Sequence, residues 1–329
     1  RDSIKMDEKN RIDTLNNIKI FTGNSNVALV EKVCDYLSIP LGKATVGRFP
    51  DGEIDVKVDE DVRGSDIFII QPTCSPVNDS LAELLILIDC FKRASSARIT
   101  AVLPYYGYAR KDRKDEGRVP ITAKLVANLI TKAGADRVLT MDLHAAQIQG
   151  FFDIPVDHLL AFPVLSEYYR EKDLSDFVVV SPDVGGIKIA RQYSNHLNMR
   201  LAVVDKRRMG PEEIEVGFVI GDVEGRNAII IDDLIATGGS ICQAARVLKE
   251  KGAKDIYVGA THPVLCGAAV EKLSEAPIKE IAVTDTIPLS DHAKSLGAKI
   301  KVLSVSRLLG EAIKRIHTNM SISSMFTEN

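Results

Sequence analysis

The segment from Ala228 to Ser240 constrains what this chain can fold into more than any other part of the sequence. It reads Ala-Ile-Ile-Ile-Asp-Asp-Leu-Ile-Ala-Thr-Gly-Gly-Ser, an apolar run followed by two carboxylates and a small polar loop. The run Ala228–Ile231 is typical of a parallel strand that is covered on both faces. Open sheets of such strands bind ligands beyond the carboxyl ends of the strands, which is where Asp232 and Asp233 stand. The segment therefore predicts an α/β fold with a ligand site at this strand end.

The loop after this strand has the chemistry of a sugar-phosphate site. Carboxylates can accept hydrogen bonds from the vicinal hydroxyl groups of ribose, whereas they repel phosphate. Hydroxyl groups in the loop, together with amides at the start of the next helix, can form a cradle for an anion. Glycines permit backbone conformations there that a side chain would forbid. The alternative is an ordinary strand–loop–helix corner with solvated acidic residues. The candidate residues are Asp232, Asp233, Thr237, Gly238, Gly239 and Ser240.

Length and charge bound the class of protein. The 329 residues are enough for two domains of ordinary size. The 42 basic and 45 acidic side chains leave a net charge of −3, which gives no general reason to expect binding to nucleic acid or to a membrane surface. Any anion site must therefore be local.

Cysteine usage and the chain start bear on the compartment. Five scattered cysteines without a CxxC motif predict a reducing compartment and no disulfide framework. No apolar run approaches the ~20 residues that span a bilayer, and residues 1–17 lack the apolar core of a signal peptide. We therefore expect a cytoplasmic protein. Because the chain begins at Arg1 rather than Met, an organellar location after removal of a transit peptide stays open.

Strand-like and helix-like segments alternate along the chain, which predicts parallel sheets with βαβ crossovers. The strand-like runs are Ile18–Phe21, Ile67–Gln71, Ile99–Leu103, Val138–Met141, Phe177–Val180, Leu201–Val204, Ala228–Ile231, Ile256–Ala260, Ile281–Val283 and Ile300–Leu303. Helical periodicity appears in Val27–Leu37, Asp79–Ala94, Ile121–Ala133, Ile187–Leu197, Ser240–Lys251 and Val305–Ile316.

The two halves of the chain look related. In each, a strand ends on an acidic residue and continues into a small polar turn, at Asp142 in the first half and at Asp232 in the second. This similarity suggests a duplicated α/β unit. We expect a polar N-terminal extension over residues 1–17, a first domain over 18–160 and a second domain over 161–329.

The segment Arg48-Phe-Pro-Asp-Gly-Glu-Ile-Asp55 is a candidate nucleobase site. Asp51-Gly52 is a turn signal. Phe49 offers an aromatic face, and Asp51 and Glu53 offer acceptors, which suit the stacking and the amino group of an adenine ring. The simpler alternative is a hairpin tip.

Two cationic segments are candidate phosphate sites. The first follows an aromatic run, Pro-Tyr-Tyr-Gly-Tyr-Ala, and holds four cations within five residues, including Arg110 and Lys111. Such local density in a near-neutral protein suits a polyphosphate, although charge runs are usually solvated faces. The second is Lys206-Arg-Arg208 at the end of a strand. A cationic loop there could close over phosphate charge as it develops, or it could be a plain surface loop.

Two further strand ends carry candidate metal ligands. His144 follows Asp142 by two residues and could contact a metal, a phosphate or a nucleotide, or it could be structural. Asp183 lies in Ser-Pro-Asp-Val-Gly-Gly and could be a Mg²⁺ ligand or a capping residue. Mg²⁺ usually takes one or two protein carboxylates together with substrate phosphates. The chain has no GxxxxGK[ST] motif and no GxGxxG motif. The sequence therefore does not favour a P-loop kinase or a dinucleotide-binding protein.

From about Ile18 to Phe326 the chain resembles the ribose-phosphate diphosphokinase (phosphoribosyl pyrophosphate synthetase) family. The resemblance rests on the segments above in this order, together with Met-Asp-Leu-His-Ala-Ala-Gln-Ile-Gln-Gly-Phe-Phe after residue 140. It implies two tandem type I phosphoribosyltransferase-like domains, each with a mainly parallel sheet flanked by helices. It also implies a requirement for Mg²⁺ and a homo-oligomer, with hexamers built from dimers.

The resemblance further implies transfer of the β,γ-diphosphoryl group of ATP to the C1 hydroxyl of ribose 5-phosphate, which gives phosphoribosyl diphosphate and AMP for nucleotide biosynthesis. Lys206 and Arg208 would act in a catalytic loop, and His144 and Asp183 would serve Mg²⁺ sites. ATP would contact Phe49, Asp51, Gly52 and Glu53, across a subunit boundary in an oligomer, and Arg110 with Lys111 beside it. Ribose 5-phosphate would contact Arg208, Asp232, Asp233, Ala236, Thr237, Gly238, Gly239 and Ser240.

Three positions depart from the family pattern. Ala236 stands where Asp is usual beside the sugar, and Lys111 stands where Gln is usual. Asp61 stands where regulated members carry a Ser in an allosteric phosphate and ADP site, and a carboxylate there should repel phosphate. The matching residues of that site are Arg63, Ser321 and Ser323. Two alternatives remain: a phosphoribosyltransferase that consumes phosphoribosyl diphosphate, and a non-catalytic subunit of the same fold.

Overall fold

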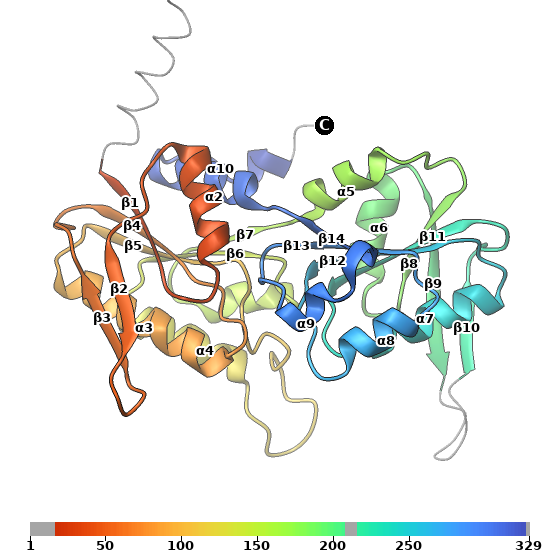
Figure 1. The fold of residues 1–329 in the computed structure, drawn as a ribbon, viewed down its shortest axis with the longest axis horizontal. Helices are drawn as coiled ribbons and strands as arrows, with labels where there is room; N and C mark the ends of the chain where they lie inside the picture. The colour runs from red at the N-terminus through yellow and green to blue at the C-terminus, as the bar shows by residue number, and fades with distance from the viewer. Residues whose placement is uncertain (1–16, 208–215, 327–329) are drawn as a thin grey trace, which may run out of the picture. The chain divides into compact units, whose positions relative to one another are not determined.

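The computed structural model describes residues 17–207 and 216–326, which form two compact units (Figure 1). The first unit comprises the chain up to Leu159 together with the chain from Val305 onward, and the second unit comprises Leu160–Ser304. The sequence placed residues 161–329 in one domain. The structure differs here, because α10 (Ser306–His317) packs on α2 (Val27–Leu37) of the first unit.

The first unit is built on a five-stranded sheet in the order β1-β4-β5-β6-β7, in which every neighbouring pair is parallel. Helices α3 and α4 pack on one face of the sheet, and Figure 1 shows α2 and α10 on the other. Full burial of β4, whose residues are all apolar after the first, reflects this double cover. The elements are β1 (Ile18–Thr22), β4 (Asp66–Ile70), β5 (Arg98–Leu103), β6 (Arg137–Met141), β7 (Val156–Leu159), α3 (Val77–Arg93), α4 (Thr122–Ala133), η1 (Ala146–Phe151) and η3 (Ser323–Phe326).

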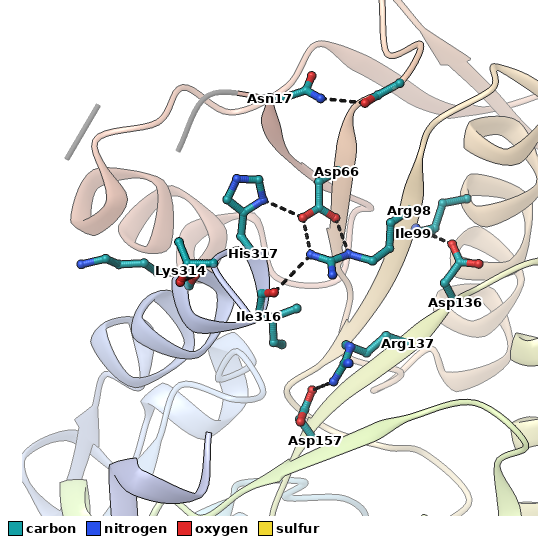
Figure 2. A network of polar contacts seen from close by, with 12 residues as sticks. Asn17, Asp66, Arg98, Ile99, Asp136, Arg137, Asp157, Lys314, Ile316 and His317 are labelled. Atoms are coloured by element: carbon teal, nitrogen blue, oxygen red, sulfur yellow. Dashed lines mark hydrogen bonds and ion pairs between the residues drawn. The ribbon is translucent and has the colours of Figure 1, made fainter. Parts of the chain in front are cut away.

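A polar network fastens α10 to this sheet (Figure 2). Nδ1 of His317 lies 2.7 Å from Oδ2 of Asp66, and Nε of Arg98 donates to Oδ1 of Asp66 at 2.8 Å. Arg98 also donates to the carbonyl of Ile316 at 3.3 Å. Burial acts to raise the pKa of Asp66, but the contacts with His317 and Arg98 outweigh it and hold that pKa below its ordinary value. An amphipathic helix pattern does not say which core a helix covers; this charged network does.

A separate antiparallel hairpin, β2 (Ala44–Arg48) with β3 (Ile54–Val58), extends the first unit. Its partly buried residues pack against the same core as α3, which contacts β3. The hairpin thereby presents residues 49–53 at its tip.

The second unit has a seven-stranded sheet in the order β10-β9-β8-β11-β12-β13-β14. Only β10, at one edge, runs antiparallel to its neighbour within the described sheet. Residues 178 and 180 of β8 share a core with α7 and α8, whereas residues 177 and 179 share one with α5 and α6. The sheet is therefore the middle of three layers. The elements are α5 (Phe162–Arg170), β8 (Phe177–Ser181), α6 (Ile187–His196), β9 (Arg200–Arg207), β10 (Val216–Ile220), β11 (Asn227–Leu234), α7 (Gly239–Glu250), β12 (Ile256–His262), α8 (Ala269–Glu275), β13 (Glu280–Thr284), α9 (Asp291–Lys294), η2 (Gly297–Lys299) and β14 (Ile300–Leu303).

The α/β class and the mainly parallel sheets flanked by helices are confirmed, as is every strand and helix predicted from periodicity. Periodicity missed β2, β3, β7, β10, α5, α8 and α9, which have four to nine residues each and are too short to show a clear pattern. Among the described residues no helix is long and apolar enough to cross a bilayer.

Candidate functional site

The strand order of the second unit reverses between β8 and β11, and we call the carboxyl-terminal ends of these two strands the crevice. After β8 the chain moves outward to β9 and β10, then returns to add β11 on the other side of β8. This reversal of strand order is the point at which open α/β sheets bind ligands, beyond the carboxyl ends of the strands. Asp183 follows β8, and Asp232 and Asp233 belong to the last part of β11. The structure thus brings together three acidic residues that the sequence had singled out separately.

The charges in this crevice perturb one another. The pKa of Asp232 is raised from 3.8 to about 8, first by burial and then by the negative charges of Asp233 and Asp183. The backbone amide of Asp233 donates to Oδ1 of Asp232 at 2.9 Å and partly offsets this effect. Hydrogen-bond donors or a cation would relieve the repulsion, so the crevice favours ligands that carry hydroxyl groups or bring a metal ion.

Asp183 also performs the capping role that was the alternative interpretation. Its Oδ1 accepts a hydrogen bond from the amide of Gly186 at 3.0 Å, and its carbonyl accepts one from Oγ of Ser181 at 2.6 Å. A Cβ at position 186 would lie only 2.9 Å from Oγ of Ser181, so glycine is required for this tight turn. A carboxylate has about four lone-pair sites, so capping leaves acceptor capacity for a ligand.

The loop between β11 and α7 is held from both ends. The amide of Ile235 donates to the carbonyl of His262 at 2.9 Å, and the amide of Cys266 donates to the carbonyl of Ala236 at 3.0 Å. Gly238 has a φ of +71°, and its carbonyl accepts from the amide of Cys242 in α7. Thr237 and Ser240 are exposed, and α7 begins at Gly239. Hydroxyl groups and a helix N-terminus therefore meet here, as an anion cradle requires.

Of the predicted cationic loop, the structure describes the backbone of residues 206 and 207, which end β9. Residue 206 belongs to β9 and is opposite residue 217 of β10, at the edge of the sheet. The side chain of Lys206 and the whole of Arg208 lie outside the described part of the chain. Their roles stay predictions.

The structure makes residues 49–53 a hairpin tip. The amide of Phe49 donates to the carbonyl of Glu53 at 2.8 Å, and the amide of Glu53 donates to Oδ1 of Asp51 at 3.1 Å. Gly52 has a φ of +94°, which favours glycine at this turn. The tip leaves the ring of Phe49 half exposed, at 49%. The hairpin alternative is therefore correct for the backbone, and an exposed aromatic ring on it is available for stacking.

The aromatic residues before Arg110 fix the backbone of that segment. Tyr106 is buried and donates to the carbonyl of Ala123 at 2.7 Å. The amide of Gly107 donates to Oγ1 of Thr73 at 2.7 Å, and a Cβ at Gly107 would lie 2.5 Å from the carbonyl oxygen of Thr73. Arg110 and Lys111 follow with exposed side chains. The segment is therefore a rigid base that presents two cations.

His158 supports the loop of the candidate residue His144, and the sequence reasoning missed it. Its Nε2 accepts a hydrogen bond from the amide of Leu143 at 2.9 Å, which fixes the loop that carries His144. Burial lowers the pKa of His158, so the ring is neutral and keeps an acceptor nitrogen. Gln149 lies 3.3 Å from its Nδ1. The signal available in the sequence was the Asp157-His158 pair, which lies in β7, a strand that periodicity missed.

The residues matched to an allosteric site lie in short turns of the first unit. Oδ1 of Asp61 accepts from the amide of Arg63 at 3.0 Å. The hydroxyl oxygens of Ser321 and Ser323 lie 2.9 Å apart in the segment after α10. Asp61 is thus a turn residue that also places a negative charge beside Arg63.

A metal-ligand cluster or a surface pocket would be an alternative to this site. Within residues 17–207 and 216–326, no three His, Cys, Asp or Glu side chains are grouped to hold a metal. A pocket of about 320 Å³ lies at the amino ends of β8 and β9, lined by residues such as Phe177 and Arg200. It is at the opposite end of those strands from Asp183, so it is not the candidate site.

Comparison with known proteins comes from sequence and from structure. Residues 18–134 match a family model described as the N-terminal domain of ribose phosphate pyrophosphokinase, and residues 209–327 match a phosphoribosyl synthetase-associated domain. A ribose-phosphate pyrophosphokinase of Rhodopirellula baltica is 59% identical, over 94% of this chain and 99% of that protein. One from Caldanaerobacter subterraneus is 57% identical, over 95% and 98%. The crystal structure of phosphoribosylpyrophosphate synthetase from Mycobacterium smegmatis superposes with a TM-score of 0.87 at 42% identity, covering 92% of this chain and all of that one.

Proposed function

The chain belongs to the ribose-phosphate pyrophosphokinase family, and from this premise we propose how its own residues carry out the family reaction. The protein is a transferase with two type I phosphoribosyltransferase-like domains. It moves the diphosphoryl group of ATP to the C1 hydroxyl of ribose 5-phosphate, which yields phosphoribosyl diphosphate and AMP for nucleotide biosynthesis. The observation that best supports the site assignment is the acidic crevice at the strand-order reversal, with a hydroxyl- and glycine-rich loop beside it.

Ribose 5-phosphate would bind at this crevice. Asp232 and Asp233 would accept hydrogen bonds from the ribose hydroxyls, and residues 236–240 with the start of α7 would hold the 5-phosphate. Ala236 offers no polar side chain to the sugar, but its carbonyl is engaged by Cys266. The loop conformation at this position therefore does not depend on the Asp that is usual there.

ATP would bind with residues of the first unit. Phe49 would stack on adenine, and Asp51, Gly52 and Glu53 would surround it, in an oligomer across a subunit boundary. Arg110 and Lys111 would contact the phosphates, and a Lys in place of the usual Gln adds positive charge. The rigid presentation of the exposed ring and cations supports these roles.

The family needs a divalent metal ion, and we propose that it is Mg²⁺. His144 and Asp183 would serve Mg²⁺ sites, each together with substrate phosphates. One carboxylate rather than a full cage suits Mg²⁺, which retains waters and takes few protein ligands. When bound, the ion neutralises phosphate charge, and it would also relieve the repulsion that raises the pKa of Asp232.

The reaction is an in-line displacement at the β-phosphorus of ATP. A bond forms between the C1 oxygen of ribose 5-phosphate and that phosphorus, and the bond to the oxygen of the α-phosphate breaks, so AMP leaves. Such transfers depend on positioning and charge neutralisation more than on covalent help. Asp232 and Asp233 would orient the sugar, and Arg110, Lys206 and Arg208 would supply positive charge.

The assay that tests this function mixes the purified protein with ATP, ribose 5-phosphate and Mg²⁺ and measures AMP. We expect one AMP for each phosphoribosyl diphosphate formed. Excess chelator should abolish turnover, because the phosphate charge is then not neutralised, and added Mg²⁺ should restore it. A phosphoribosyltransferase would instead release diphosphate only when phosphoribosyl diphosphate and a base are supplied. A non-catalytic subunit would show neither activity, yet would change the rate of an active partner.

Regulation provides a second prediction. Asp61→Ser should create or strengthen activation by inorganic phosphate, because the substitution removes a carboxylate beside Arg63. We expect the phosphate activation curve of the variant to rise severalfold where that of the parent stays flat. Asp59→Ser, which alters an exposed carboxylate nearby, serves as the control. Superimposable curves for the parent and the Asp61 variant would show that Asp61 has no regulatory role.

We further propose a homo-oligomer that acts in the cytoplasm. Support for the compartment comes from its cysteines, all of which are free thiols in the described residues. Size-exclusion chromatography with light scattering tests the assembly.

A further inference from the structure

The loop assigned to ribose 5-phosphate is anchored from behind by the chain that follows β12. The carbonyl of His262 accepts hydrogen bonds from the amides of Ile235 and Val264, at 2.9 and 3.0 Å. The amide of Leu265 returns a bond to the carbonyl of Ile235 at 2.8 Å. Residues 262–266 therefore extend the sheet pairing into the first two residues of the loop.

The side chain of His262 belongs to a buried polar cluster at the carboxyl ends of β12 and β13. Its Nδ1 lies 2.9 Å from Oγ1 of Thr286, which donates to the carbonyl of Thr261 at 3.2 Å. Oγ1 of Thr284 donates to the same carbonyl at 2.7 Å. None of these four side chains is more than 2% exposed. We call Thr261, His262, Thr284 and Thr286 the threonine–histidine cluster.

One residue joins the cluster to the loop. The imidazole of His262 is fixed by the cluster, and the carbonyl of the same residue carries the loop amide of Ile235. Buried polar groups whose hydrogen bonds are made specify one arrangement of the side chain. An apolar side chain of similar size could adopt several arrangements. The position of the loop backbone is therefore set in part by the ring of His262.

We infer that His262 is a positioning residue for ribose 5-phosphate: through its carbonyl it holds the sugar-phosphate loop in the binding conformation, and the threonine–histidine cluster holds His262. This inference rests on the proposed assignment of that loop. The inference assigns no contact with ATP to His262. Substitution of His262 should therefore affect the binding of the sugar substrate alone.

The same strand offers a matched control. The hydroxyl group of Tyr169, in α5, donates to the carbonyl of Val258 in β12 at 2.9 Å and is fully buried. Tyr169→Phe deletes a buried hydrogen bond to β12 four residues before His262, away from the loop. We therefore expect this variant to be less stable than the parent and to keep the sugar-phosphate loop in its position.

The test compares His262→Leu, His262→Asn and Tyr169→Phe with the parent, by Michaelis constants for each substrate and by thermal unfolding. For His262→Leu we expect the KM for ribose 5-phosphate to rise about tenfold and the KM for ATP to change less than about twofold. Asn can place an amide group near the position of Nδ1, so His262→Asn should recover most of the loss. Tyr169→Phe should lower the unfolding temperature and leave both KM values unchanged.

Thr286→Val tests the same contact from the other side, and it replaces His262→Leu if that variant does not fold. It should raise the KM for ribose 5-phosphate, and its effect should not add to that of His262→Leu. If these variants lose stability as Tyr169→Phe does and keep the parental KM, His262 is only a core residue and the inference is wrong. If the parent itself forms no AMP, the proposed function fails instead. Calorimetric titration of ribose 5-phosphate into the parent and His262→Leu then decides the inference.

Discussion

Lys206→Ala is expected to reduce kcat by about 10²–10³-fold while the KM for ATP changes by less than about threefold. Negative charge shifts between the α- and β-phosphates only as AMP leaves. A cation that meets this shift stabilises the transition state more than bound ATP, so its loss lowers kcat rather than affinity. Residue 206 lies near the end of β9, beside the edge strand β10.

Steady-state kinetics with both substrates varied checks this effect. Lys254→Ala is the matched control, since it removes one exposed lysine of the same unit, paired with Asp176 at the amino ends of the strands. It should leave kcat and both KM values unchanged. Lys206→Arg keeps the charge and should retain more activity than Lys206→Ala. Undiminished turnover in Lys206→Ala would remove this residue from the mechanism.

The candidate site in the second unit stands out in the sequence because its parts are local. A buried strand, two carboxylates and a glycine loop stand side by side between Ala228 and Ser240, and their order alone indicates a strand end with a ligand loop. The structure adds the reason this strand end is used. Strand order reverses between β8 and β11, which brings Asp183 to Asp232 although 48 residues lie between them. Strand order is a long-range property that periodicity does not encode.

Besides the short elements, sequence reasoning missed contacts between residues that are not neighbours in the chain. Residues 262–266 pair with the candidate sugar loop through backbone hydrogen bonds. The side chain of His158 accepts a hydrogen bond from the loop that carries His144. Similarly, α10 was placed in the second domain because it follows β14 in the chain. Its partners are Asp66 and Arg98, which lie more than 200 residues earlier.

The two sheets also bear on why the two units carry different kinds of candidate site residue. In the second unit strand order reverses between β8 and β11, where Asp183, Asp232 and Asp233 lie. In the first unit the named strands follow in sequence from β1 to β7, with an isolated parallel bridge between Ile20 of β1 and Leu41. Its candidate residues lie instead on a hairpin tip and on two loops. Several separated contacts of this kind would suit a long, flexible nucleoside triphosphate.

Asp232→Asn is expected to lose function and to gain stability. With a divalent ion bound, which relieves the repulsion and restores the charge, the carboxylate would accept hydrogen bonds from ribose hydroxyls, whereas the amide group turns one acceptor into a donor. Loss of a hydrogen bond to a charged group costs about 1.5–3 kcal/mol, so kcat/KM for ribose 5-phosphate should fall by about 10–10²-fold. Asp176→Asn, a change of an exposed carboxylate in the same unit, should leave kcat/KM at the parental value.

The gain in stability should depend on pH in a defined direction. Burial, Asp233 and Asp183 raise the pKa of Asp232 to about 8, so between pH 4 and 8 the folded protein retains a proton that the unfolded chain has lost. The free energy of unfolding of the parent therefore falls as pH rises through this range, because the charged form is disfavoured only in the folded state. Asparagine does not titrate and escapes this loss. Each pKa unit corresponds to about 1.4 kcal/mol, so the advantage of Asp232→Asn should grow from near zero at about pH 4 to on the order of 1–5 kcal/mol at about pH 9. Urea unfolding without divalent ions measures it, and an equal advantage at both pH values would show that Asp232 is not held protonated by its neighbours.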